Sequence, residues 1–370
     1  MRDEDARFME EAIRLSLEHR GQTSTNPSVG CIIVRDDGDG PVIVGRAVTA
    51  IGGRPHAETQ ALKMAGEKAR GATAYVTLEP CSHHGKTPPC TEALIASGIG
   101  RVVISVLDPD ERVSGRGVAL LREAGIKVTL GILAQESERA LEAYLMRQRS
   151  KRPHVTLKLA VSADGMIGRK GEGQVRITGA EAREAVQHLR ARTDAILVGI
   201  GTAIADDPEL TTRLPGLEHR SPVRIVLDCR LELPVRSKLV RTARDVPVIA
   251  VADSSIARGS VDDVFNDRRE ALEAFGVEIL DCDSARLDDL MTALATRGVS
   301  SLVVEGGAKT ARSFLDAGLV DRILLFRGPG TLGADGIASP FDTESIPAGF
   351  ALVETLSFGA DICETYERDI

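Results

Sequence analysis

Two stretches of sequence decide how this chain is interpreted: PHAETQAL at residues 55–62 and TLEPCSHHGKTPPC at residues 77–90. They contain one histidine, His56, two cysteines, Cys81 and Cys90, and a carboxylate, Glu58, that need not bind metal. A zinc ion held by three protein ligands keeps a fourth position open, where it lowers the pKa of bound water to about 7. The pattern therefore predicts a catalytic zinc site with His56, Cys81 and Cys90 as ligands and Glu58 as the proton carrier.

The zinc-dependent nucleobase deaminases share this set of ligands, and their signature is H-x-E followed by P-C-x-x-C. This chain has His56-Ala57-Glu58 and Pro80-Cys81, but eight residues instead of two separate Cys81 from Cys90. The signature is therefore met only in part, and the long spacing needs its own explanation.

A structural zinc site is the main alternative, and it needs a fourth ligand, which His83 or His84 can supply from the same loop. The residues that follow them, Gly85, Lys86 and Thr87, make the loop polar and cationic. Such a loop is better suited to gripping an anionic substrate than to closing a metal cage. We therefore favour the catalytic site.

The composition of the 370 residues is that of a soluble α/β protein, with 43% apolar and 27% charged residues, and its length predicts two domains. A net charge of −8 offers no basic surface for a phosphate backbone, which argues against nucleic acid as a partner. No stretch is long enough to span a membrane, and the first 20 residues do not resemble a signal peptide. Six scattered cysteines fit a reducing cytoplasm.

The first part of the chain alternates between helical and strand patterns. We expect a helix over roughly residues 3–20, a hairpin at 31–45 and a helix from about 55 to Gly71. Strands are predicted at 73–78, 101–106 and 126–131, with helices near 90–98, 116–124 and 134–149. This alternation predicts a sheet with helices on both faces.

A basic stretch without an apolar pattern, RQRSKRP, follows, and we place the domain boundary there, giving domains at 1–149 and 150–370. A new series of strand patterns begins with HVTLKLAVS and continues through AILVGI, VRIVLD, VPVIAVA, SLVVEGG and DRILLF. His-x-Glu does not recur in this half, so the second domain is not a copy of the first.

The cysteine loop with its long spacing resembles the deaminase half of the bifunctional riboflavin-biosynthesis deaminase and reductase. The resemblance extends through TSTNPSVGCIIV, RPHAETQALKMAGEKARGATAYVTLEPCS and Asp108-Pro109. In the second half KLAVSADGMIG, ITGAEAREAV, LRARTDAILVGIGTAIADDPELTTR, LVVEGGAKT, AGLVDRILLF and GTLGADG look like the reductase half. The resemblance implies an N-terminal cytidine-deaminase-like three-layer α/β/α domain and a C-terminal dihydrofolate-reductase-like α/β domain.

The resemblance implies two successive reactions on one phosphorylated intermediate. The first domain would bind one Zn²⁺ and hydrolyse the 2-amino group of 2,5-diamino-6-ribosylamino-4(3H)-pyrimidinone 5′-phosphate. The second would use NADPH to reduce the ribosyl group, giving 5-amino-6-ribitylamino-uracil 5′-phosphate. The partner is thus a small molecule, and a homo-oligomer is a further possibility that the sequence leaves open.

The same resemblance assigns substrate contacts in the deaminase half to Asn26, His83 and Lys86, with the lysine at the phosphate. In the reductase half it assigns substrate contacts to Lys158, Arg190, Asp206 or Asp207, Arg213 and Glu305. It assigns cofactor contacts to Ser162, Thr178, Gly199, Gly201, Thr202, Gly306 and Gly307. Glycine turns after strands are also common for plain geometric reasons, and Arg190 has the alternative of a solvated helix residue.

Lys158 stands out on physical grounds, because a lysine within the apolar strand pattern TLKLAV is costly unless its charge has a partner. No residue is obliged to act as a general acid in the reduction, so the proton donor stays unassigned.

Three positions depart from the family pattern: Thr49 replaces a usual histidine, Asp110 a usual asparagine, and QVRITG around Arg176 lacks a tryptophan. Two other functions stay open from the residues alone. One is a deaminase of free nucleosides or of a tRNA base, and the other is a structural zinc module joined to a nucleotide-sensing domain.

Overall fold

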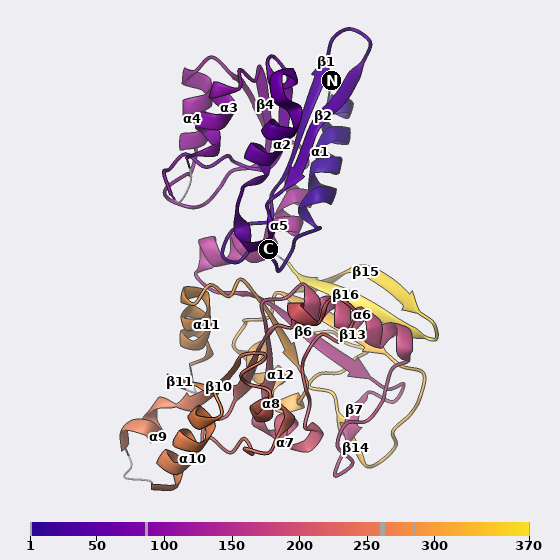
Figure 1. The fold of residues 1–370 in the computed structure, drawn as a ribbon. Helices are drawn as coiled ribbons and strands as arrows, with labels where there is room; N and C mark the ends of the chain where they lie inside the picture. Colours follow the sequence, from indigo (N-terminus) through magenta and orange to yellow (C-terminus); the bar gives the residue numbers. More distant parts are fainter. Residues whose placement is uncertain (1, 86–87, 260–262, 284–285, 370) are drawn as a thin grey trace. The chain divides into compact units, whose positions relative to one another are not determined.

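The computed structural model describes residues 2–85, 88–259, 263–283 and 286–369 (Figure 1). The chain divides into two compact units, Met1–Lys151 and Arg152–Ile370. Among the described helices, none has the length and apolar character that crossing a membrane requires.

The first unit contains one five-stranded sheet in the order β2-β1-β3-β4-β5. The antiparallel hairpin β1–β2 pairs with β3, and β3, β4 and β5 run parallel. Its strands are β1 Gly30–Asp36, β2 Pro41–Val48, β3 Thr73–Leu78, β4 Arg101–Val106 and β5 Lys127–Leu130. Its α-helices are α1 Arg2–Ser16, α2 Ala57–Ala65, α3 Cys90–Ala96, α4 Arg116–Glu123 and α5 Ala134–Ser150.

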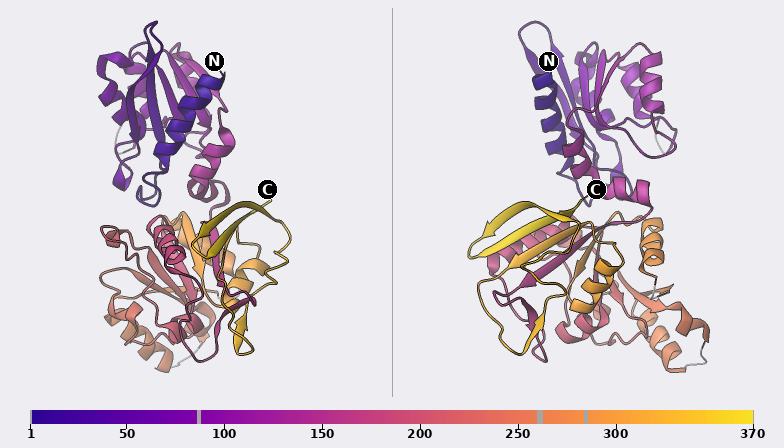
Figure 2. Two further views of the ribbon diagram at one scale, coloured as in Figure 1. Left: turned by 90° about the vertical axis from the view of Figure 1, so that its right-hand side faces the viewer. Right: turned by 180° about the vertical axis from the view of Figure 1, so that it is seen from behind.

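Two separate apolar clusters lie on the two faces of this sheet. Phe8, Met9 and Ala12 of α1 pack on one face, and Ala61 of α2, Leu94 of α3 and Leu121 of α4 pack on the other. The two views of Figure 2 show α1, in indigo, on one side of the strands. The predicted three-layer α/β/α arrangement is confirmed.

The predicted helix from about 55 to 71 is shorter in the structure. It begins at Ala57 and ends at Ala65, and a separate 3₁₀ turn, Gly66–Ala69, follows. The reason is Gly66, whose backbone has φ of 56°, a conformation that ends a helix and that glycine adopts without penalty.

The second unit is built on a nine-stranded sheet in the order β11-β10-β9-β8-β12-β6-β13-β16-β15. The first seven strands in this order are parallel, and β16 and β15 are antiparallel at one edge. The strands are β6 His154–Val161, β8 Ala195–Gly199, β9 Val223–Leu227, β10 Val248–Asp253, β11 Glu278–Cys282, β12 Ser301–Glu305, β13 Arg322–Arg327, β15 Phe350–Phe358 and β16 Asp361–Arg368. A small two-stranded sheet pairs β7 Met166–Arg169 with β14 Gly336–Ala338.

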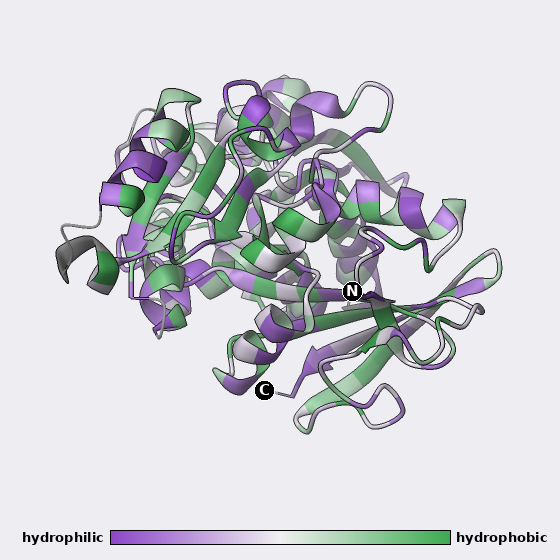
Figure 3. Ribbon diagram, turned by 90° about the horizontal axis from the view of Figure 1, so that it is seen from below, coloured by the Kyte–Doolittle hydropathy of each residue, from purple (hydrophilic) through white to green (hydrophobic). Residues whose placement is uncertain are grey.

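The helices of the second unit are α6 Ala180–Ala191, α7 Ile200–Asp206, α8 Lys238–Arg241, α9 Ser254–Gly259, α10 Asp263–Ala274, α11 Leu287–Thr296 and α12 Ala308–Asp316. Figure 3 shows hydrophobic strands inside this unit and helices with polar outer faces. The central strands β8, β12 and β6 are neighbours, and ligands of open parallel sheets bind at the carboxyl ends of such strands. The fold thus gathers Gly199, the Glu305-Gly306-Gly307 turn and Ser162 at one edge of the sheet.

Candidate active sites

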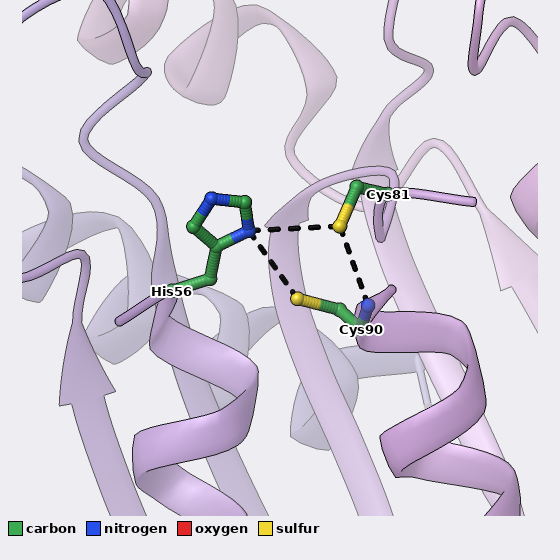
Figure 4. Close-up of side chains that lie close together, drawn as sticks. All are labelled: His56, Cys81 and Cys90. Carbon is green, nitrogen blue, oxygen red and sulfur yellow. Dashed lines mark hydrogen bonds between the residues drawn. The ribbon is translucent and has the colours of Figure 1, made fainter. Parts of the chain in front are cut away.

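The three predicted zinc ligands converge in the first unit (Figure 4). His56 is the residue just before α2, Cys81 lies in the loop after β3, and Cys90 is the first residue of α3. His56 Nδ1 lies 3.6 Å from Cys81 Sγ and 3.3 Å from Cys90 Sγ. In a tetrahedral zinc site, bonds of about 2.0 Å to nitrogen and 2.3 Å to sulfur put such ligand atoms roughly 3.5 Å apart. The residues therefore fit a zinc ion.

The electrostatics of Cys81 favour the thiolate that a metal needs. Its sulfur accepts hydrogen bonds from the Cys90 thiol, from His56 and from the backbone N–H of Cys90 at 3.3 Å. These interactions outweigh burial and lower the pKa of Cys81 to about 4. The pKa of Cys90 is raised, because its thiol donates to Cys81 and is buried. The proton shared by the two sulfurs is the one that a bound cation displaces.

Glu58 lies beside this cluster in the first turn of α2 and is only 3% exposed. Burial and the negative charge of Cys81 raise its pKa to about 7. A carboxyl group with a pKa near neutrality can both accept and return a proton, which is the property that a general acid–base catalyst needs.

The structure argues against the closed structural zinc site. Within the described residues, the metal-binding group consists of His56, Cys81 and Cys90, and no fourth His, Cys, Asp or Glu side chain joins it. His84 is exposed and pairs instead with Glu92, with 2.9 Å between Nε2 and Oε1. The cluster therefore has the three-ligand form that leaves a coordination position for water.

The other predicted deaminase residues occupy the same region in part. Asn26 is half-buried against Gly53, three residues before the ligand His56. His83 is half-buried, and its Nδ1 has no hydrogen-bond partner in the described part of the chain. An electrostatic interaction with His83 makes a small contribution to lowering the pKa of Asp110, so these two side chains are near each other. Lys86 lies outside the described residues.

Two departures from the family pattern have structural roles. Thr49 is buried, and its hydroxyl accepts the backbone N–H of Val29 at 3.0 Å, which joins the end of β2 to the start of β1. Asp110 forms a two-pronged ion pair with Arg112, which lowers the pKa of Asp110 to about 2. Asp110 is therefore an anion whose charge is neutralised locally. Arg176, the third departure, is exposed.

Sequence reasoning missed one supporting residue, Glu79, which precedes Pro80-Cys81. Its buried carboxylate accepts backbone N–H groups from Gly115 at 3.0 Å and from Val118 at 3.1 Å, at the start of α4. It thus ties the segment that carries Cys81 to a helix. An acid directly after the apolar strand TAYVTL was the available signal, because a carboxylate there needs partners.

In the second unit, Lys158, Arg190 and Glu305 form one cluster, in which Arg190 and Glu305 are buried and Lys158 is partly buried. Glu305 on β12 is in register with Lys158 on β6. Arg190 on α6 binds both carboxylate oxygens of Glu305, at 2.9 and 3.1 Å. Although burial opposes it, the charges of Arg190 and Lys158 lower the pKa of Glu305 to about 2, and burial lowers the pKa of Lys158. The alternative of a solvated Arg190 is wrong, because this side chain is buried and paired.

The loop after α7 lies beside this cluster. Arg190 donates to the carbonyl of Thr211 at 3.3 Å, and the charge of Arg213 helps to lower the pKa of Glu305. Arg213 itself pairs with Glu209 at 2.9 Å. Burial raises the pKa of Asp206, whereas Asp207 accepts the backbone N–H of Lys238 at 2.8 Å and so caps α8. Of the two acids, Asp207 thus has a structural role at the start of α8, and Asp206 is the better candidate for contact with the substrate.

The predicted glycine turns pack closely against each other. Gly306 and Gly307 have positive φ angles of 81° and 52°, and a Cβ atom on Gly306 would lie 2.9 Å from Thr202 Cγ2. A Cβ on Gly199 would lie 2.4 Å from Thr310 Oγ1, whereas the space beside Gly201 is open. Side-chain-free turns at the carboxyl ends of two adjacent strands let a nucleotide phosphate approach the backbone. The residues present therefore fit a dinucleotide.

Ser162 and Thr178 lie in local turns. Ser162 donates to Asp164 at 2.5 Å and accepts the backbone N–H of Met166 at 3.0 Å, in the turn between β6 and β7. Thr178 lies just before α6, and its carbonyl accepts a hydrogen bond from the side chain of Arg183 in that helix.

A three-ligand zinc site beside a buried acid, on a three-layer unit, defines the class of zinc-dependent deaminases; the second unit adds a parallel sheet with phosphate-type turns. Residues 2–106 match the family described as "cytidine and deoxycytidylate deaminase zinc-binding region". Residues 153–364 match the RibD C-terminal domain.

Curated relatives agree with these matches. The riboflavin biosynthesis protein RibD of Aquifex aeolicus is 40% identical over 90% of this chain and 89% of its own length. The protein of the same name from Escherichia coli is 38% identical over 97% and 98% of the two chains.

Solved structures give the same result for the fold. Acinetobacter baumannii RibD superposes with a TM-score of 0.87 at 33% identity and covers 100% of both chains. A Thermotoga maritima protein, described as a diaminohydroxyphosphoribosylaminopyrimidine deaminase/5-amino-6-(5-phosphoribosylamino)uracil reductase, gives 0.84 at 32% identity over 99% of both chains.

This chain belongs to the RibD family of bifunctional riboflavin-biosynthesis proteins. It is accordingly a deaminase and a reductase in one polypeptide, with Zn²⁺ and NADPH as cofactors. The predicted family, fold class, enzyme classes and cofactors are confirmed.

Proposed function

We propose that this chain carries out two successive steps on one phosphorylated pyrimidine. The first is the hydrolytic deamination of 2,5-diamino-6-ribosylamino-4(3H)-pyrimidinone 5′-phosphate, assigned to residues 1–149. The second is the NADPH-dependent reduction of the ribosyl group to ribityl, assigned to residues 150–370. The observation that carries the proposal is the convergence of His56, Cys81 and Cys90 beside the buried Glu58.

In the deaminase step, His56, Cys81 and Cys90 would hold the zinc ion, which would supply a water activated for attack at neutral pH. Glu58 would carry one proton of the attacking water to the ring nitrogen and then carry the second, from the hydroxyl on the attacked carbon, to the departing amine, so that water is consumed and ammonia released. Asn26, His83 and Lys86 hold the substrate. The raised pKa of Glu58 supports its role, because both of its protonation states are accessible.

In the reductase step, NADPH supplies the hydride, and the protein aligns it with C1′ of the sugar. Gly199, Gly201, Thr202, Gly306 and Gly307 hold the cofactor, together with Ser162 and Thr178. Lys158, Arg190, Arg213, Glu305 and Asp206 form the substrate side of the site. We assign Asp207 to holding the loop, because its carboxylate already caps α8.

The test of the deaminase assignment is Glu58→Gln in the full-length protein. Zinc content should stay at that of the unchanged protein, ammonia release should fall by roughly 10²–10⁴-fold, and NADPH oxidation on the deaminated intermediate should continue. Glu67→Gln, an exposed acid just after the same helix, serves as the control and should change none of these.

Retained deamination in Glu58→Gln would favour a structural zinc module. The unchanged protein gives a second check. If it deaminated cytidine or adenosine but not the diaminopyrimidinone phosphate, this would favour a deaminase of free nucleosides or of a tRNA base.

We infer further that the protein acts in the cytoplasm on a small molecule and that it self-associates. All six cysteines lack a disulfide bond, which suits a reducing compartment, and two of them are needed as metal ligands.

The proposed contact with a second copy is the edge strand β15, which exposes Leu352, Val353 and Leu356 and has a free backbone edge among the described strands. Light scattering after size exclusion measures the mass in solution, and a monomer at micromolar concentration would contradict this.

A further inference from the structure

The side chain of Asn26 is held without hydrogen bonds. The backbone N–H of Asn26 donates to the Thr23 carbonyl at 3.1 Å, and its carbonyl accepts the Thr23 hydroxyl at 2.7 Å. The side-chain amide, in contrast, has no hydrogen-bond partner among the described residues. Both its donor and its acceptor are therefore available to a ligand, and something other than hydrogen bonding must fix its position.

Gly53 supplies that restraint by packing. This buried glycine lies in the turn that leads to the ligand His56, and the turn is anchored by the N–H of Gly52, which donates to the Gln22 carbonyl at 2.8 Å. A Cβ atom on Gly53 would lie 2.3 Å from Asn26 Nδ2 and 2.5 Å from the Thr23 carbonyl oxygen. The amide thus rests directly on the Cα of Gly53, in space that any side chain would occupy.

We propose that Gly53 is a positioning residue for deamination, which acts by seating the Asn26 amide against the turn of the zinc ligand His56. This inference rests on the proposed function, in which Asn26 contacts the pyrimidine or the ribose. An amide offers one donor group and one acceptor, which matches a pyrimidinone edge that presents a carbonyl next to an N–H or amino group. Because the amide is seated before the substrate arrives, less of its freedom is lost on binding.

The chain offers a matched control at the neighbouring position. Gly52 and Gly53 have similar positive φ angles of 78° and 86°, so alanine is strained at both. A Cβ on Gly52, however, meets no atom within 4 Å. Gly52→Ala therefore adds the backbone strain alone, whereas Gly53→Ala adds the strain and also pushes on the Asn26 amide and on the Thr23 carbonyl that holds the Asn26 backbone. The Asn26→Ala background separates the effect on the amide from the backbone clash.

The experiment measures deaminase kcat and KM, zinc content and reductase activity in full-length Gly53→Ala, Gly52→Ala, Asn26→Ala and the double variant Gly53→Ala/Asn26→Ala. We expect Gly53→Ala to raise the deaminase KM about tenfold above Gly52→Ala, as the loss of one or two hydrogen bonds does. Zinc content and reduction of the deaminated intermediate should not change. In the Asn26→Ala background, Gly53→Ala should still lower thermal stability but should have no further effect on KM.

Equal KM values for Gly53→Ala and Gly52→Ala, or a Gly53→Ala effect on KM that persists without Asn26, would overturn this inference and leave the proposed function intact. An unchanged KM in Asn26→Ala would overturn the substrate contact itself, and the inference with it.

Asn26→Gln gives a second test should Gly53→Ala fail to fold. The longer side chain cannot rest on Gly53, so its KM should equal that of Asn26→Ala. A KM equal to that of the unchanged protein would overturn the positioning role.

Discussion

Glu58 and Glu305 are both buried carboxylates, yet their surroundings move their pKa values in opposite directions. Burial and a neighbouring thiolate raise the pKa of Glu58 to about 7, so that it can carry protons. Against the effect of burial, the cations Arg190 and Lys158 lower the pKa of Glu305 to about 2, so that it remains an anion. Two chemically similar residues thus receive different roles from the charges that the fold places next to them.

Glu305 gives a prediction about acid stability. Its pKa is about 2 in the folded protein, against an ordinary value of 4.5 for a glutamate side chain. A depressed folded-state pKa stabilises the protein above pH 4.5, and this contribution, about 3 kcal/mol, is lost as the pH falls from 4.5 toward 2. Urea unfolding of Glu305→Gln should therefore show a deficit of about 3 kcal/mol at pH 7 that shrinks below pH 4.5.

Glu354→Gln, an exposed acid on β15 of the same sheet, is the control for this measurement and should show no such deficit. A deficit in Glu305→Gln that is the same at pH 3 and pH 7 would contradict the assigned charge state.

At single positions, the sequence predicted more of the chemistry than of the supports. The zinc ligands follow from residue type, and Lys158 was expected to have a charged partner because it interrupts an apolar strand. Its partner Glu305 lies 147 positions away, on a strand that only the sheet order makes adjacent. The position of Glu79 after an apolar strand signals that it needs partners, but the sequence does not identify them, because the partners of Asp207 and Glu79 are backbone N–H groups.

At the scale of elements, the start of α4 supports the loop that carries Cys81. Gly117 is buried in this helix, and a Cβ there would lie 2.4 Å from the Pro80 carbonyl and 3.1 Å from Glu79 Oε1. An alanine inside a helix usually stabilises by about 0.5–1 kcal/mol relative to glycine. Gly117→Ala should instead lower stability and weaken zinc retention about tenfold, because Pro80 adjoins Cys81. Zinc release to a chelator measures this.

Ala119→Gly is the control in the same helix, since this residue is exposed. It should cost about 1 kcal/mol of helix stability and leave zinc release unchanged. If zinc release were faster in Ala119→Gly, or if it were not faster in Gly117→Ala than in the unchanged protein, α4 would not support the loop that carries Cys81.

The turn between β12 and α12 gives a prediction for the reductase. Gly306 has φ of 81°, and its Cα faces Thr202 of α7. Gly306→Ala should raise the KM for NADPH about tenfold, because strain of roughly 1–2 kcal/mol and the added Cβ disturb the backbone to which we assign the cofactor contact. Steady-state NADPH oxidation on the deaminated intermediate measures it.

Gly318→Ala is the matched substitution, because Gly318 has φ of 68° and nothing within 4 Å of an added Cβ. It should leave the KM for NADPH unchanged. Equal KM values in the two variants would place the cofactor elsewhere.

Elements with a continuous apolar pattern, such as β3, β4 and β8, lie where the sequence predicted them, because buried parallel strands leave a clear pattern. The helix after His56 was predicted too long, since its apolar pattern continues past Gly66 while the backbone does not.

At the scale of the whole molecule, residues alone predicted an α/β chain of two parts and a zinc-dependent deamination. The reductase could not be derived in the same way, because its proposed site consists of glycine turns and of charges from β6, α6 and β12 that lie far apart in the sequence. Only the resemblance of the whole second half to a known family predicted its chemistry.

We propose that one chain performs zinc-dependent deamination followed by NADPH-dependent reduction, at separate sites. The most direct measurement is the ratio of ammonia released to NADPH oxidised on the diaminopyrimidinone phosphate, in the unchanged protein and in Cys81→Ser. The unchanged protein should give one ammonia per NADPH. Cys81→Ser should give neither from this substrate, yet should oxidise NADPH normally with the deaminated intermediate. NADPH oxidation by Cys81→Ser on the amino substrate, or loss of NADPH oxidation on both substrates, would contradict two successive reactions at separate sites.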